Sequence, residues 1–243
     1  MSEKKIERIA QLLAKAESTT PEEAEALTEH AERLMVKYAI DQAVIDEKRA
    51  SKGNTSEKIV EVRLDFTGAY RGELLHLASS VAHGLGALRG MQFTGGTGKV
   101  FSFWLIGFES DVKQAKLLVE SLQVQAAIAV RAWWKLNKED FAYQGAYDQE
   151  KARRSFVHGF GSGAGNRIHT NRQQAVQEAG TGTELVLVSR EAKVQAHLDA
   201  LHTRKGRART ATGRDGAASQ GYRAGQNANT GEKPVSGTKG IGA

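Results

Sequence analysis

The sequence predicts an α+β fold, with an N-terminal helical hairpin, then a small sheet with long helices, and a flexible basic C-terminal tail. Three observations support this prediction. Apolar residues recur at helical spacing near the N-terminus, short apolar runs alternate with long amphipathic stretches in the middle, and Gly and basic residues dominate the end. The predicted units are a hairpin at 1–47, an α+β domain at 58–203 and a largely flexible Gly-rich tail at 204–243.

The first unit is predicted to be two helices joined by a short turn. Ile6, Ile9 and Leu13 lie at helical spacing, with charged and amide residues between them. Thr20 is a natural N-cap for the second helix, and Glu23 three residues later completes a capping box. We expect the apolar faces of the two helices to pack against each other.

The second unit is predicted to be strand–helix–strand–strand–helix at its centre. Glycine and polar clusters separate runs of apolar residues, and the spacing within each run distinguishes strands from helices. The predicted elements are a strand at 59–66, a helix at 70–85, strands at 87–93 and 99–108 with a glycine hairpin loop at 94–98, a long helix capped by Ser110 or Asp111 and reaching Trp133, a glycine-interrupted helix at about 147–175, a short strand at 185–188 and a last helix at 192–201.

Composition places the chain among globular proteins. Its 243 residues are 40% apolar and 26% charged, which is typical of a chain that buries a core. The lack of cysteine excludes a disulfide scaffold, a thiolate zinc site, an iron–sulfur site and a cysteine nucleophile. The chain has no long apolar run and begins with an amphipathic pattern instead of a signal sequence. We therefore expect a cytoplasmic protein with no membrane partner.

Two glycine-rich runs invite comparison with phosphate-binding loops. Gly95-Gly96-Thr97-Gly98-Lys99 lacks the flanking residues that a P-loop requires, and a predicted strand follows it, so a hairpin turn is favoured. The run from Gly159 to Gly165 follows a predicted helix, whereas a dinucleotide loop follows a strand. Its alternating glycines permit either close helix packing or the approach of a ligand to the backbone. Neither run predicts a cofactor.

Histidine, acidic and serine residues nominate no catalytic or metal-binding centre. Glu73, His76 and His83 share one predicted helix face, but seven residues correspond to about 10.5 Å of rise, too far for both histidines to hold one ion without a bend. Ser162 lies between glycines without the spacing of a nucleophile elbow. A hydrolase around Glu73, His76 and His83 is therefore only the third hypothesis, and we favour a protein that is not an enzyme.

Basic residues give the strongest functional signal. From Arg204 to the C-terminus there are eight basic and two acidic residues, which account for the whole net charge of +6. Other basic residues follow a predicted helix that ends in Trp133 and Trp134, and aromatic rings of this kind stack on exposed bases. Such a surface neutralises phosphates. The candidate phosphate-binding residues are Arg153, Arg154, Arg167, Arg172, Arg204, Lys205, Arg207 and Arg209.

The N-terminal residues also carry a specific pattern. Residues 5–26 are Lys-Ile-Glu-Arg-Ile-Ala-Gln-Leu-Leu-Ala-Lys-Ala-Glu-Ser-Thr-Thr-Pro-Glu-Glu-Ala-Glu-Ala, and residues 31–41 are Ala-Glu-Arg-Leu-Met-Val-Lys-Tyr-Ala-Ile-Asp. This pattern resembles the helical module of the domain-of-unknown-function 2786 family, with Ala39 in place of the usual Gly. The rest is similar, more loosely, to the α+β region that follows this module, as in the Gly-Tyr-Arg-Ala-Gly run at 221–225.

The resemblance implies a setting more than an activity. The family has no established activity, so no catalytic residue is carried over from it. Its members occur in bacteria and bacteriophages, which implies a bacterial cell or a phage-infected host. The similarity at 221–225 implies that part of the tail, near 214–228, docks on the body.

Two function classes follow from these observations. The leading hypothesis is a non-enzymatic nucleic-acid-associated protein, with DNA or RNA as its partner and phosphate contacts from a basic helix and the C-terminal tail. The alternative is an oligomerising or host-protein-binding phage accessory factor that uses the amphipathic hairpin as its docking face. Neither hypothesis requires a cofactor.

Overall fold

The computed structural model describes residues 3–17, 57–93, 100–179, 181–201 and 216–228, together with eight single positions between 23 and 45. Within these residues the fold is α+β and mostly helical, with six α-helices and a three-stranded antiparallel sheet. The elements are α1 (Glu3–Glu17), β1 (Ile59–Phe66), α3 (Arg71–Leu85), β2 (Arg89–Phe93), β3 (Phe101–Phe108), α4 (Glu109–Asn137), the 3-10 helix η1 (Lys138–Phe141), α5 (Ala146–Ala179), α6 (Thr181–Ala200) and α7 (Gly216–Gln226).

The sheet has the strand order β1-β3-β2, and the central strand β3 is buried on both faces. Phe103 and Leu105 point into the main core with the helices, whereas Ile106 and Phe108 contact Val194 of α6. This alternation follows from the two-residue period of a strand. The register pairs Ile59 with Phe108 and Phe66 with Phe101 between β1 and β3, and Arg89 with Ile106 and Phe93 with Ser102 between β2 and β3.

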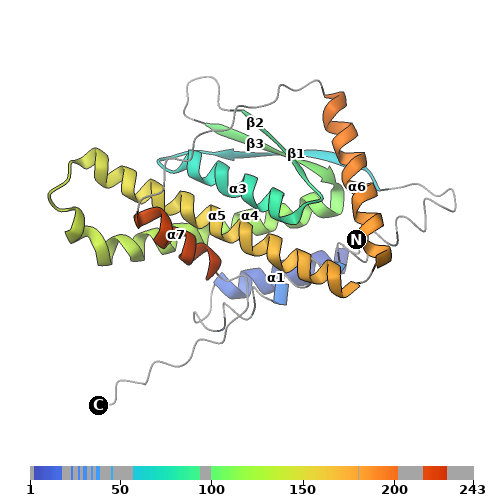
Figure 1. Ribbon diagram of the computed structural model, residues 1–243, viewed down its shortest axis with the longest axis horizontal. Coiled ribbons are helices and arrows are strands. Elements are labelled where there is room, and N and C mark those ends of the chain that lie inside the picture. Colours follow the sequence, from blue (N-terminus) through green and yellow to red (C-terminus); the bar gives the residue numbers. More distant parts are fainter. Residues whose placement is uncertain are drawn as a thin grey trace, which may run out of the picture.

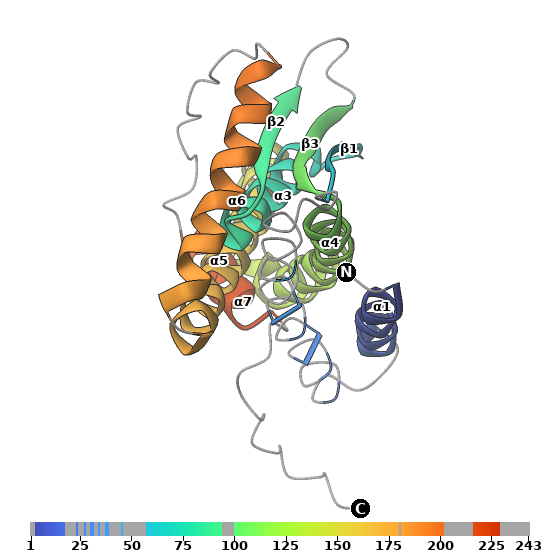
Figure 2. The ribbon, with the colours of Figure 1, turned by 90° about the vertical axis from the view of Figure 1, so that its right-hand side faces the viewer.

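Helix α5 organises the helical layer. It packs between α3 and α7, and Figure 1 shows α7 lying along α5 on the side away from the sheet. Figure 2 shows α6 beside β2, on the opposite side of the molecule from α1. None of the described helices has the length and apolar character that a membrane crossing requires.

Helix α1 confirms the first helix of the predicted hairpin. Ile9 and Leu13 are buried in the main core, and α1 contacts α4. Among the single described positions of the predicted second helix, Ala31 is buried in the same core, and Leu34 and Tyr38 pack against it. The positions between them lie outside the described residues, as do most of the expected linker at 48–57 and the predicted hairpin loop at 94–98.

The predicted strand at 185–188 is wrong, because these residues belong to α6. Leu187, Arg190 and Val194 are buried, and they are spaced three and four residues apart, as on one face of a helix. Leu185 and Val188 are exposed. The Leu-Val-Leu-Val run has a high strand propensity, but burial of one helical face against the sheet outweighs this weak local preference.

The predicted cap of α4 by Ser110 or Asp111 is also wrong. The N-cap position is Phe108, and its side chain makes no cap hydrogen bond. The backbone N–H of Ser110 instead donates to Glu57 Oε1 at 2.6 Å, and the Asp111 carboxylate accepts a hydrogen bond from Arg190. A carboxylate from before β1 therefore supplies the negative charge that a helix N-terminus favours.

The glycine-interrupted helix predicted at about 147–175 is confirmed as α5, which is continuous over 34 residues. The tail was expected to be largely flexible, yet residues 216–226 form α7, whose inner face is buried. The docking near 214–228 that the family resemblance implied is thus present for the part of that segment that the structure describes.

Candidate functional site

Glycines bring α5 and α7 into close contact. Gly159 and Gly163 of α5 face α7, and Gly221 and Gly225 of α7 face α5. A Cβ at these four positions would overlap the carbonyl oxygens of Ala218, Tyr222, Phe156 and Phe160, respectively. The two helices therefore approach at backbone distance along matched glycine pairs spaced by four residues.

The alternate glycines of the same run face α3. A Cβ at Gly161 would lie 3.0 Å from the Cα of Leu77, and a Cβ at Gly165 would lie 2.6 Å from the Cβ of Ser80. The run from Gly159 to Gly165 thus serves helix packing on both sides of α5. Of the two interpretations that the sequence left open, close packing is the one that the structure shows.

Arg153 and Arg154 lie on the first half of α5 and have different surroundings. The Arg153 guanidinium lies over the Trp134 ring, 4.6 Å from its centroid. Arg154 pairs with Glu73 of α3 at 3.1 Å and with Glu150 at 3.4 Å. Arg153 therefore keeps a partly exposed cation beside an aromatic ring, whereas Arg154 joins α5 to α3.

Arg167 and Arg172 connect α5 to other helices. Arg167 donates to the carbonyl oxygens of Gln226, at 2.5 Å, and Ala228, at the C-terminal end of α7. Arg172 pairs with Glu191 of α6 at 3.0 Å. The four arginines predicted on the body do not form one patch, and three of them have polar partners within the fold. The four predicted tail residues, Arg204, Lys205, Arg207 and Arg209, lie outside the described residues.

The segment between α6 and α7 starts and ends on anchored helices. On the α6 side, Arg190 pairs with Asp111 at 2.9 Å and with Glu57 at 3.3 Å, and both Arg190 and Asp111 are buried. On the α7 side, the glycine contacts and Arg167 fix the helix to α5. The connecting residues 202–215 include five Lys and Arg residues and one acidic residue.

A polar cluster lies between α3 and α5. His76 of α3 and His158 of α5 stack with their ring centroids 3.8 Å apart, and Ser162 Oγ lies 2.9 Å from His76 Nε2. Burial, with a smaller contribution from the charge of His158, lowers the pKa of His76 to about 4. Burial also lowers the pKa of His158, opposed by Glu73. Both rings are therefore neutral at pH 7.

Of the residues in the third hypothesis, His76 belongs to this cluster, and Glu73 lies three residues before it on α3, paired with Arg154. His83 lies further along α3, where it stacks with His169 at 6.1 Å. The Ser162–His76 contact has the length of a nucleophile–base pair. Within the described part of the chain, however, no three His, Asp or Glu residues converge to hold a metal ion. The stack of His76 on His158 and the hydrogen bond between His76 and Ser162 both fasten α3 to α5.

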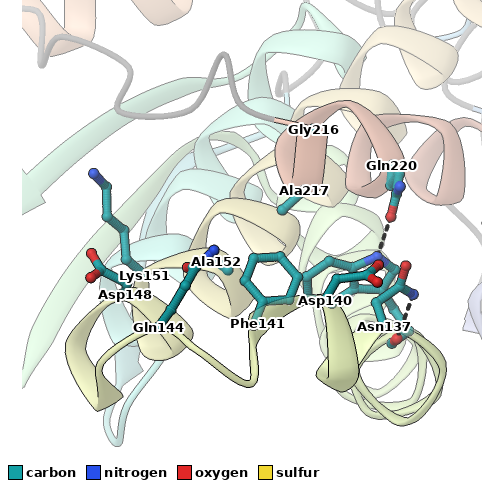
Figure 3. A pocket seen from close by; sticks show the side chains of 11 residues that line it. Asn137, Asp140, Phe141, Gln144, Asp148, Lys151, Ala152, Gly216, Ala217 and Gln220 are labelled. Carbon is teal, nitrogen blue, oxygen red and sulfur yellow. Dashed lines mark hydrogen bonds between the residues drawn. The ribbon is translucent and has the colours of Figure 1, made fainter.

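A cleft of about 340 Å³ opens where α7 begins (Figure 3). Its walls come from the end of α4, from η1, from the start of α5 and from the first residues of α7. Its polar side chains are Asn137, Asp140, Gln144, Asp148, Lys151 and Gln220. The Trp133 indole N–H donates to Gln220, and the Phe141 ring packs edge-on against Trp133 at 5.9 Å.

The charges of this cleft are available to a ligand. Asp140, Asp148 and Lys151 are exposed and form no ion pair with another described residue. No sequence motif indicates this site, because its lining residues come from two separate stretches, 133–152 and 216–220. Only the docking of α7 brings Gly216 and Gln220 opposite Phe141.

The N-terminal residues are the part of the chain that comparison with known proteins places in a family. Residues 4–42 match the family model described as "Protein of unknown function (DUF2786)". Residues 4–42 are a DUF2786 domain. This DUF2786 domain begins within α1 and is anchored on the body through Ile9 and Leu13. The chain matches no curated protein and no solved structure in these comparisons.

Proposed function

We propose that the protein binds nucleic acid, without a catalytic role, through the basic segment that joins α6 to α7. One observation carries this proposal: both helices that flank the segment are fixed to the body. The phosphate contacts are assigned to Arg204, Lys205, Arg207 and Arg209. A segment held at both ends samples fewer conformations than one with a free end, and it therefore loses less entropy when it binds.

Charge supports the proposal. Because residues 1–203 contain equal numbers of acidic and basic residues, the excess positive charge begins at Arg204. A concentrated positive charge attracts a polyanion through release of its counterions. Arg153 adds a guanidinium over Trp134, whereas Arg154, Arg167 and Arg172 are assigned to holding the helices together.

A salt titration of the full chain against single- and double-stranded DNA and RNA tests this function. The variant with Arg204, Lys205, Arg207 and Arg209 replaced by Gln should bind more weakly. Its slope of log affinity against log salt should be shallower by about 3, because each lost phosphate contact removes about 0.7–0.9.

A matched control variant replaces Lys58, Lys113, Lys116 and Arg131 by Gln, which removes the same charge from exposed positions on the body. Its slope should stay close to that of the wild type. Equal losses in the two variants would mean that net charge alone attracts the nucleic acid. Undetectable binding of the wild type at low salt would refute the function itself.

Association with a second copy of the chain is the other candidate function. The apolar side of α1 contributes Ile9 and Leu13 to the core, so we move the docking face from the hairpin to α4. There Val124, Ile128 and Leu136 are exposed at helical spacing. An antiparallel pair of α4 helices would place Val124 opposite Leu136 of the other copy, as a two-fold axis requires. Light scattering on the wild type and on Ile128→Asp tests this: a monomeric wild type would exclude the dimer.

A further inference from the structure

We propose that the cleft at the start of α7 binds one base of a nucleic-acid strand whose phosphates lie on the basic segment. This inference rests on the proposed function and adds the ligand group that the site takes. The cleft and the segment are adjacent in the chain, since Arg214 and Asp215 directly precede Gly216 in the cleft wall. The proposal places a strand bound by the segment beside the mouth of the cleft, at the point where the segment joins α7.

The aromatic residues of the cleft suit a flat ligand. Figure 3 shows the Phe141 ring in the middle of the cleft, with Gln144 on one side and Asp140 on the other. Phe141 packs against Trp133 and Trp134, and the hydrogen bond from Trp133 to Gln220 holds the indole in place. A supported aromatic ring of this kind is a platform for stacking any of the four bases.

The polar residues favour a base over a phosphate. Asp140 and Asp148 accept hydrogen bonds from the amino and ring N–H groups of a base, and their negative charges repel a phosphate. Lys151, on the α5 side of the cleft, donates to base carbonyl oxygens or to the neighbouring phosphate. None of these three charges is used in an ion pair with another described residue.

Size limits the ligand to a single base with its sugar. The volume of about 340 Å³ is at the lower end of the range for small-ligand pockets, which is about 300–1,000 Å³. Small residues on α7 leave this space open: Ala217 lies over Phe141 in Figure 3, and a Cβ at Gly216 would meet no atom within 4 Å. A stacked pair of bases would need a larger pocket.

The test compares two oligonucleotides of one length, one carrying bases and one abasic at every position, by fluorescence anisotropy with the full chain. The strand type is the one that binds best in the salt titration. The wild type should bind the base-carrying strand about tenfold or more tightly than the abasic strand, since one stacked base contributes about this much. Phe141→Leu keeps an apolar side chain there but removes the stacking ring, so it should abolish most of this preference.

Two further variants complete the design. Gln144→Ala changes a solvent-exposed side chain in the cleft wall and should reduce the preference for bases without disturbing the fold. Phe93→Leu is the matched control, because Phe93 is an exposed aromatic residue on β2, outside the cleft. It should leave the preference unchanged. The variant with four Gln in the tail should weaken binding of both strands by a similar factor.

The outcomes separate the two proposals. Equal affinity of the wild type for both strands would overturn the base-binding cleft and leave phosphate binding by the tail in place. A preference for bases that persists in Phe141→Leu and Gln144→Ala would assign the base to another site and overturn the inference as well. Failure to bind either strand would refute the proposed function, and this inference with it.

Discussion

Replacing Gly163 with Ala should loosen α7 while leaving α5 intact. Gly163 faces α7, and a Cβ there would lie 2.9 Å from the backbone nitrogen of Gln226 and 3.0 Å from the carbonyl carbon of Tyr222. Both atoms belong to the backbone, so no side chain can turn away to relieve the overlap. The whole of α7 must move outward, which costs about 1–3 kcal/mol, the range observed for overpacked sites.

The size of the effect depends on the equilibrium that is measured. In a helix interior Ala is more favourable than Gly by about 1 kcal/mol, and this gain stabilises α5 against global unfolding. The gain cancels when α7 separates from an intact α5, because α5 is helical in both states. The full overpacking cost therefore falls on α7 docking, whereas the global free energy of unfolding changes by about 1 kcal/mol less.

Hydrogen exchange measured by mass spectrometry reports on α7 docking separately from global unfolding. Amides in the 216–228 peptide should exchange roughly 5- to 150-fold faster in Gly163→Ala than in the wild type. Gly216→Ala is the matched control, since a Cβ there has no neighbour within 4 Å, and its α7 should stay as protected as in the wild type. Unchanged exchange in Gly163→Ala, or equal acceleration in the control, would refute the assignment of these glycines to helix packing.

Two other perturbations test the buried polar contacts between helices. The folded chain keeps His76 neutral down to about pH 4, whereas the unfolded chain protonates it near pH 6.5. The free energy of unfolding should therefore fall by up to about 3 kcal/mol as the pH decreases through this window. Urea titrations should show a shallower fall in His76→Asn, and a full fall in the exposed control His83→Asn. Asp111→Ala leaves the buried Arg190 without its closest carboxylate and should cost about 3–5 kcal/mol in the free energy of unfolding. The control Glu109→Ala removes only an exposed ion pair and should cost less than about 1 kcal/mol. Equal costs for these two variants would contradict the importance of the buried pair.

The elements that the sequence predicts well are those whose pattern is local. The strand at 59–66 and the helix at 70–85 agree with β1 and α3 within a residue, because their apolar spacing is unambiguous. The errors arise where distant contacts decide the outcome. The Leu-Val-Leu-Val run at 185–188 becomes helical through burial against the sheet, and α4 takes its cap from Glu57, 53 positions from Ser110.

The candidate sites show the same limit. Charge alone singles out the tail, since the excess of basic residues after residue 203 is a property of composition. No local pattern pairs Ser162 with His76, because they are 86 positions apart in the sequence. The matching glycine pairs at 159 and 163 and at 221 and 225 were the available signal for α7 docking, since equal four-residue spacing permits two helices to meet along small residues.

The glycine packing, the cleft and the basic segment are parts of one arrangement. Gly159 and Gly163 hold α7 against α5, and the first residues of α7 in turn form one wall of the cleft. The same helix fixes the end of the segment that carries the tail charges. Gly163→Ala should therefore displace the cleft wall and release one end of the segment, while every charge on the protein stays the same. In the oligonucleotide assay, Gly163→Ala should reduce the preference for bases more than it reduces binding of the abasic strand, because phosphate attraction depends on charge whereas base binding depends on the position of α7. Equal reductions would mean that α7 does not form part of the base site.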